Sequence, residues 1–258
     1  MAATAATAAT AATRARATCR VGALAVLALS GGSACTMLSG VDDLEFIDGP
    51  GEVEPPPAPS AADLLALTAS CEQVSSGLYR NARDPVPEPS IPVCALEGAY
   101  FWQAGMGIDC DGLSHDSPEC PSEGAHTAAT DSTGQALDSL TLPFVVVPAA
   151  TAVEGCPGVP WSYEEAGLAM GSVVAVVYRD QLAYGVLGDV GPCDAIGMAS
   201  HAMAKRLGIN VEPGRPGVDS GVTYFAFSGP DAIVSVIEDQ AQAAELGEQR
   251  AAELLAAP

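Results

Sequence analysis

Short apolar runs, bounded by Gly, Pro or charged residues, dominate the middle of the chain. Runs of six to eight residues lie at 143–148, 172–178, 181–188 and 222–228. They are rich in Val, Tyr and Phe, which favour strands. Only Arg179-Asp180 separates the second run from the third, which is hairpin spacing. The pattern predicts a mainly β (α+β) domain with a small β-barrel-like architecture.

Three other segments have the apolar spacing of helices. A short helix is predicted over 61–71, and another over 197–207, where Gly208 stands in the stop position. A longer C-terminal helix is predicted to start at Pro230-Asp231 and to be interrupted at Gly247. The chain is therefore expected to add one or two short helices and a C-terminal helix to its strands.

The first 35 residues have the pattern of an export signal. Arg14, Arg16 and Arg20 precede the apolar run Val21–Leu29, which is too short for a membrane span of about 20 residues. The following Ser30–Cys35 resembles the cleavage box of bacterial lipoproteins, with Cys35 as the lipid acceptor. Because Gly32 stands where that motif usually has Leu, ordinary cleavage after Ala34 remains an alternative. We expect an exported protein, lipid-anchored to the cell envelope or secreted.

Composition divides the rest of the chain. The stretch from Thr36 to about Ser60 is acidic and Pro-rich, which is typical of a tether. The expected segments are a lipoprotein-type signal peptide at 1–35, a tether with a short helix at 36–92, the folded domain at 93–229 and a helical extension at 230–258.

The charge balance limits the partners. Ten Lys and Arg against 32 Asp and Glu give a net charge of −22 at pH 7. Such a surface repels phosphates, which argues against nucleic acid as a partner. The same charge permits a cationic polymer, and membrane contact is expected only through a lipid anchor.

Eight cysteines occur without the paired CxxC spacing of zinc sites, so no metal or other cofactor is expected. Export favours disulfides. If Cys19 leaves with the signal and Cys35 is modified, the remaining six allow 15 pairings. The preferred set is Cys71–Cys94, Cys110–Cys120 and Cys156–Cys193.

Two acidic segments carry the candidate chemistry. Asp189 ends an apolar strand between Gly188 and Gly191, where a ligand can approach the backbone closely; turn capping is the alternative. Asp109 and Asp111 begin like a calcium loop, but Leu113 stands where a third oxygen ligand belongs. A substrate groove and a disulfide-pinned Asx turn remain open for these two acids.

These segments resemble motifs of the glycoside hydrolase family 75 chitosanases. Gly188-Asp189 is followed by Ile196–Ser200, where the family has Ile-Gly-Glu-Ala-Ser and this chain has Met198 in place of Glu. Ile108–Gly112 and Gly217–Gly221 match two further family segments. The resemblance implies inverting endo-hydrolysis of chitosan, a β-1,4-linked glucosamine polymer, by two carboxyl groups.

Met198 replaces the family's second acid, so the resemblance leaves Asp189 as the one catalytic candidate. In the predicted helix, Met198 lies about 150° from the centre of the apolar face, where a groove residue would be. The expected substrate-binding residues are Asp109, Asp111, Trp102, Asp194, Asp219 and Tyr224.

Three hypotheses follow. The first is a pseudoenzyme that still binds an amino-sugar polysaccharide. The second is an active chitosanase in which Asp194, Glu165 or Asp219 supplies the missing acid. The third is a structural envelope lipoprotein without catalysis. Serine and zinc hydrolase mechanisms are disfavoured, because the chain has neither Gly-x-Ser-x-Gly nor His-Glu-x-x-His.

Overall fold

The computed structural model describes residues 57–83, 88–122, 124–151, 156, 158–212 and 216–257. The expected signal peptide, Cys35 and most of the acidic tether lie outside the described residues. Within the described ranges, no helix combines the length and apolarity that a membrane crossing requires.

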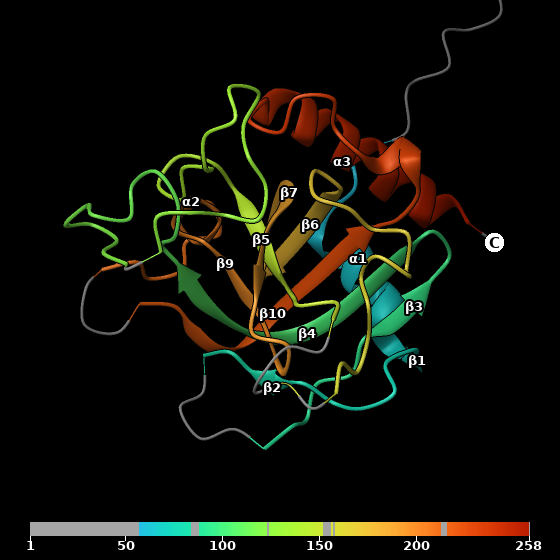
Figure 1. Ribbon diagram of the computed structural model, residues 1–258. Helices are drawn as coiled ribbons and strands as arrows, with labels where there is room; N and C mark the ends of the chain where they lie inside the picture. The colour runs from blue at the N-terminus through green and yellow to red at the C-terminus, as the bar shows by residue number, and fades with distance from the viewer. Residues whose placement is uncertain are drawn as a thin grey trace, which may run out of the picture. The chain divides into compact units, whose positions relative to one another are not determined.

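Six described strands close into a barrel (Figure 1). Its wall runs in the order β4, β10, β6, β7, β5, β9, and β9 then pairs with β4 to complete the ring. The strands are β4 (Ala99–Asp109), β5 (Phe144–Pro148), β6 (Val173–Tyr178), β7 (Gln181–Gly191), β9 (Met198–Ser200) and β10 (Val218–Phe227). The predicted mainly β, barrel-like fold is thus confirmed.

The predicted hairpin is present between β6 and β7. Tyr178 pairs with Gln181, and Arg179 in the turn has a φ of 58°. A two-residue loop with a positive φ matches the twist of the strands that it joins.

Short strands extend the barrel wall at its edges. β1 (Glu72–Gln73) pairs with β3 (Cys94–Leu96), which in turn pairs with the start of β4. β2 (Arg80–Asn81) and β8 (Ala195–Ile196) form a separate parallel pair. The division of the chain at residues 35, 92 and 229 stays a prediction, but segments on both sides of residue 92 contribute to this sheet.

Two apolar clusters lie on opposite faces of the wall. Inside the barrel, the fully buried rings of Trp102 and Tyr224 stack with centroids 5.4 Å apart. The outer cluster includes Phe101 and Phe225, and it is covered by side chains of two helices. These are α1 (Ala61–Ala66), which continues into the 3-10 turn η1 (Leu67–Ala69), and α3 (Gln240–Ala256). Burial of each large side chain contributes about 1.5–3 kcal/mol, so both faces stabilise the wall.

The C-terminal helix differs from its prediction at both marked points. After the 3-10 turn η2 (Pro230–Ala232), α3 begins only at Gln240, where the Asp239 side chain accepts hydrogen bonds from the Ala241 and Gln242 N–H groups. Gly247 does not interrupt α3. A Cβ at Gly247 would lie 2.7 Å from Tyr184 Cδ1, so this glycine lets α3 approach β7 closely.

The predicted helix over 197–207 is also wrong in its first part. Met198–Ser200 forms β9, which pairs with β4 on one side and β5 on the other, and only His201–Arg206 is helical (α2). The Ser200 hydroxyl accepts the Met203 N–H and so caps the helix. Barrel closure overrides the local helical pattern, and in β9 Met198 is half-buried while Ala199 and Ser200 are buried.

The six cysteines pair as in the preferred set. Cα–Cα distances are 5.1 Å for Cys71–Cys94, 5.3 Å for Cys110–Cys120 and 6.1 Å for Cys156–Cys193. All three lie within the range that a disulfide spans.

Candidate functional site

Asp189 lies at a β-bulge in the barrel wall. Val145 and Val146 of β5 are consecutive, yet they pair with Leu187 and Asp189 of β7, so Gly188 is the extra residue. A Cβ at Gly188 would lie 2.6 Å from the Cβ of Phe144, so only glycine fits at this position without a shift of its neighbours. A bulge re-aims the side chains of its strand, and here it directs Asp189 to the outer face.

Two backbone N–H groups fix the Asp189 side chain. Its Oδ1 accepts from Ala128 at 2.7 Å and from Val190 at 2.8 Å. Only 8% of Asp189 is exposed, and burial raises its pKa, while these two hydrogen bonds act to lower it. Ala128 belongs to the long connection between β4 and β5, which sequence reasoning did not link to this site.

Asp109 and Asp111 come from the end of β4 and the loop that follows it. Asp109 Oδ1 accepts the Asp111 N–H at 3.1 Å, and the Cys110–Cys120 disulfide holds the loop. The Asx turn considered from the sequence is thus present. The Ser122 hydroxyl donates to Asp111 Oδ1, a contact that the sequence gave no signal for.

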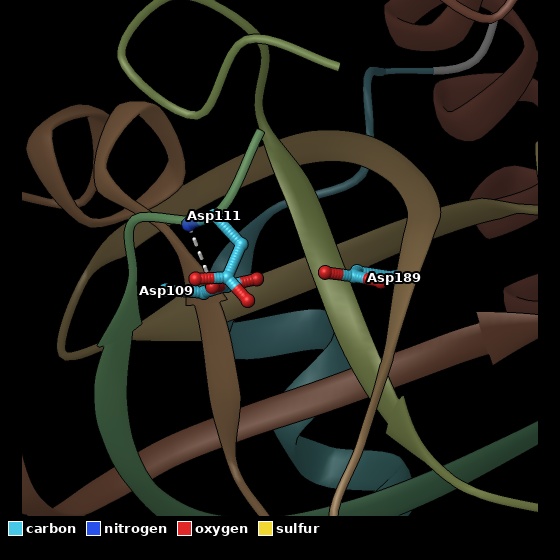
Figure 2. A group of neighbouring side chains, drawn as sticks. All are labelled: Asp109, Asp111 and Asp189. Atoms are coloured by element: carbon cyan, nitrogen blue, oxygen red, sulfur yellow. Dashed lines mark hydrogen bonds between the residues drawn. The ribbon is translucent and has the colours of Figure 1, made fainter. Parts of the chain in front are cut away.

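The three carboxyl groups converge. One oxygen from each of Asp109, Asp111 and Asp189 lies within 4.8 Å of the other two, and Figure 2 shows the side chains gathered at one place. Asp109 is only 6% exposed, and burial, with added repulsion from Asp189 and Asp111, raises its pKa to about 7. A carboxyl group with a pKa of about 7 holds a proton for part of the time near neutral pH.

Met198 lies in the same row of the wall as Asp189. Val146 pairs with Asp189 on one side and with Met198 on the other, so all three share one face. Since neighbouring strands are about 4.8 Å apart, the Cα atoms of Asp189 and Met198 are about 10 Å apart. The Met198 side chain is half-buried and lies close to Gly107 and Gly191, neither of which has a side chain to fill the space.

The other acidic candidates lie outside this cluster. Asp194 accepts two hydrogen bonds from Arg80, each of 2.8 Å, and this partner lowers the pKa of Asp194. Asp219 lies 3.8 Å from Arg83 and lines a cavity of about 470 Å³ together with polar side chains such as Gln103.

Glu165 lines a different cavity, of about 540 Å³, with Tyr100 and Trp161. Among the described residues, none of the three proposed substitutes joins the carboxyl cluster around Asp189.

Trp102 and Tyr224 are both 0% exposed and stack inside the barrel. The Tyr224 hydroxyl donates to the Gly105 carbonyl at 2.8 Å. Neither ring is accessible to a polymer in this structure. The alternating strand pattern explains this, because residues 102 and 224 fall on the inward-facing positions of β4 and β10.

Comparison with known proteins gives the family of this barrel and its carboxyl cluster. Residues 106–255 match the family model described as fungal chitosanase of glycosyl hydrolase group 75. The chain belongs to this family, and the match includes all three clustered aspartates and Met198.

Endo-chitosanase B of Aspergillus oryzae is a curated relative. It is 30% identical over an alignment of 156 residues, and the match covers 54% of this chain and 63% of the relative. The chain thus matches less than two thirds of the relative's length.

Proposed function

We propose that this domain binds chitosan on the outer face of the barrel around Asp189 and is catalytically degenerate. The observation that carries the proposal is the row formed by Asp189, Val146 and Met198. In this row, the site keeps one carboxyl group and has a thioether where the second would stand.

The chemistry of inversion needs both groups. One carboxylic acid protonates the leaving oxygen, and a carboxylate about 6.5–9.5 Å away activates a water on the opposite face of the sugar. Side chains that project from positions with Cα atoms about 10 Å apart reach such a separation. Met198 has no proton to give or take, so its presence is expected to cost at least about 10²–10⁴-fold in rate.

Asp109 does not replace the missing group. Its carboxyl lies within 4.8 Å of the Asp189 carboxyl, which is closer than the spacing that leaves room for the attacking water.

Asp194 is a poor acid for another reason. Arg80 lowers the pKa of Asp194 and so favours its ionised form. Asp219 lies beside Arg83 and Glu165 lines a separate cavity, so these two are also poorly placed to act with Asp189.

Charge supports binding of the amino sugar. The chain has a net charge of −22, and glucosamine units carry ammonium groups in their protonated state. The partly exposed Asp111 is the member of the cluster that an ammonium group approaches most easily.

The test measures hydrolysis and binding on the same preparation. A reducing-end assay on chitosan is expected to show no turnover. Calorimetry with chitosan oligomers in EDTA is expected to show binding that weakens with salt, and fully acetylated chitin oligomers are expected to bind less well. Turnover by the unmodified protein would overturn degeneracy, and equal affinity for both oligomers at low and high salt would overturn the electrostatic account.

We extend the proposal to location. The sequence pattern around Cys35 supports export and attachment through a lipid on this cysteine. Mass spectrometry of the mature N-terminus tests both steps. An unlipidated N-terminal Cys35 would reject the anchor alone, whereas an intact Met1 would reject export as well.

A further inference from the structure

We infer that Asp109, Asp111 and Asp189 form a binding site for a divalent cation, with Ca²⁺ as the ion that fits best. The inference stands on the geometry of the carboxyl cluster and does not rest on the proposed function.

The hydrogen bonds of the cluster leave one oxygen of each carboxyl available. Asp109 Oδ1 accepts the Asp111 N–H, Asp111 Oδ1 accepts the Ser122 hydroxyl, and Asp189 Oδ1 accepts two backbone N–H groups. Each Oδ1 is thereby oriented, and each Oδ2 accepts no hydrogen bond from an N–H or hydroxyl group of the described residues. Orientation of ligating carboxylates by hydrogen bonds to their other oxygens is typical of metal sites.

Asp109 provides the second, independent observation. Its Oδ2 is buried and accepts no hydrogen bond from an N–H or hydroxyl group of the described residues, although the residue is only 6% exposed. Figure 2 shows the Asp109 side chain beside that of Asp111, with the Asp189 carboxyl facing the pair. A buried carboxylate oxygen without a partner is costly, and a bound cation would remove that cost.

No Lys or Arg of the described residues neutralises the cluster. Among the ion pairs of the described residues, none involves Asp109, Asp111 or Asp189. Three neighbouring acids repel one another, so a divalent cation would offset charge that the described residues leave without an ion pair.

The spacing favours Ca²⁺. One oxygen of each carboxyl lies within 4.8 Å of one oxygen of each of the other two. Oxygens that bind one Ca²⁺ at about 2.3–2.6 Å can be up to about 5 Å apart, whereas the octahedral Mg²⁺ shell at about 2.1 Å is tighter. Asp111 is only half-buried, so water can reach the cluster to complete the six to eight oxygen ligands that Ca²⁺ takes.

The sequence argument against calcium does not apply to this arrangement. Leu113 breaks the pattern of a calcium loop, in which all ligands come from one segment. Here the third carboxylate comes from β7, 78 residues after Asp111, and the fold supplies what the loop lacks.

The experiment titrates CaCl₂ and MgCl₂ into the full chain after EDTA treatment and dialysis, at 0.15 M NaCl. We expect saturable binding of one Ca²⁺, a rise in Tm with Ca²⁺, and weaker binding of Mg²⁺. The Asp111→Asn and Asp189→Asn variants should each weaken Ca²⁺ binding at least about tenfold.

Asp116→Asn is the matched control, because Asp116 is an exposed acid of the same loop that lies outside the cluster. It should bind Ca²⁺ like the unmodified chain. Near-ultraviolet circular dichroism verifies that each variant is folded, and Asp111→Asn is the least disruptive because Asp111 is only half-buried.

Absence of saturable binding up to millimolar Ca²⁺, or equal binding by Asp111→Asn, Asp189→Asn and Asp116→Asn, would overturn the inference. Oligomer binding in EDTA is measured separately, so failure of the cation site and failure of the proposed polysaccharide binding give different results.

Discussion

Asp189 and Met198 occupy the same face of the barrel wall on strands that flank β5, with Val146 between them. The bulge at Gly188 sets the first position, and the closing strand β9 sets the second. The relationship depends on barrel closure, because β9 has only three residues and is held in place by its pairing with β4 on one side and β5 on the other.

This relationship makes Met198→Glu the most informative substitution. A carboxyl at position 198 would restore the second group opposite Asp189 at a distance suited to inversion. We expect chitosanase activity at least about 10²-fold above the unmodified protein in a reducing-end assay. Because Met198 is half-buried, the new carboxyl can stay near solvent, and the cost in stability should be about 1 kcal/mol.

Met198→Gln is the matched control, because it has the length and polarity of Glu without an ionisable group. It should remain inactive, as should Met198→Glu combined with Asp189→Asn. Activity in Met198→Gln equal to that of Met198→Glu would contradict the account of the missing acid.

The Cys110–Cys120 disulfide is predicted to support the site as well as the fold. Replacement of both residues by Ser should lower the free energy of unfolding by about 2–3 kcal/mol, as expected for a short loop. It should also weaken binding of chitosan oligomers, because Asp111 follows Cys110 directly. Urea unfolding and calorimetry measure the two effects.

Replacement of Cys71 and Cys94 by Ser is the control. Cys94 pairs with Phe101, toward the opposite end of β4 from Asp109, so this change should cost stability and leave binding intact. Loss of binding in both double variants to the same extent would mean that general destabilisation, and not the loop, explains the effect.

The sequence predicted the barrel-like fold well because most strands are marked by short apolar runs that are bounded by turn residues. Only two residues separate the apolar run 172–178 from the apolar run 181–188, and in the structure the two runs pair as an antiparallel hairpin. Motif resemblance likewise singled out Asp109, Asp111 and Asp189, with a substrate groove and an Asx turn left open for the first two, but their proximity depends on contacts between segments far apart in the chain.

The rest depended on tertiary pairing. Residues 198–200 have helical spacing, yet pairing with both β4 and β5 satisfies their backbone as a strand. Trp102 and Tyr224 are substrate-binding candidates from the sequence, but strand register turns both inward. Neither register nor closure is encoded in the local pattern of hydrophobic residues.

Gly247 gives a test of helix packing in which two effects oppose each other. Gly247→Ala raises helix propensity by about 1 kcal/mol, but the new Cβ would lie 2.7 Å from Cδ1 and 3.1 Å from Cγ of Tyr184. We expect the steric clash with Tyr184 to outweigh the gain in helix propensity, so that the free energy of unfolding falls by about 1–3 kcal/mol. In a Tyr184→Ala background the same change should stabilise, and urea unfolding of the four proteins gives the coupling. A stabilising Gly247→Ala in the unmodified protein would show that α3 can move away from β7 at little cost.

His201 makes the stability of the domain depend on pH. Its side chain is 4% exposed and Nδ1 has no hydrogen-bond partner among the described residues. Burial lowers the pKa of His201, Lys205 lowers it further, and Glu119 acts in the opposite direction.

Below the unfolded-state pKa of about 6.5, the unfolded chain binds the proton at His201 more readily than the folded chain does, so the free energy of unfolding falls as the pH drops from 7.5 to 5.5. His201→Gln should remove this part of the pH dependence, measured as the difference between the two proteins in urea unfolding at pH 7.5, 6.5 and 5.5. Parallel losses in both proteins would assign the acid sensitivity to other groups and reject a role for His201.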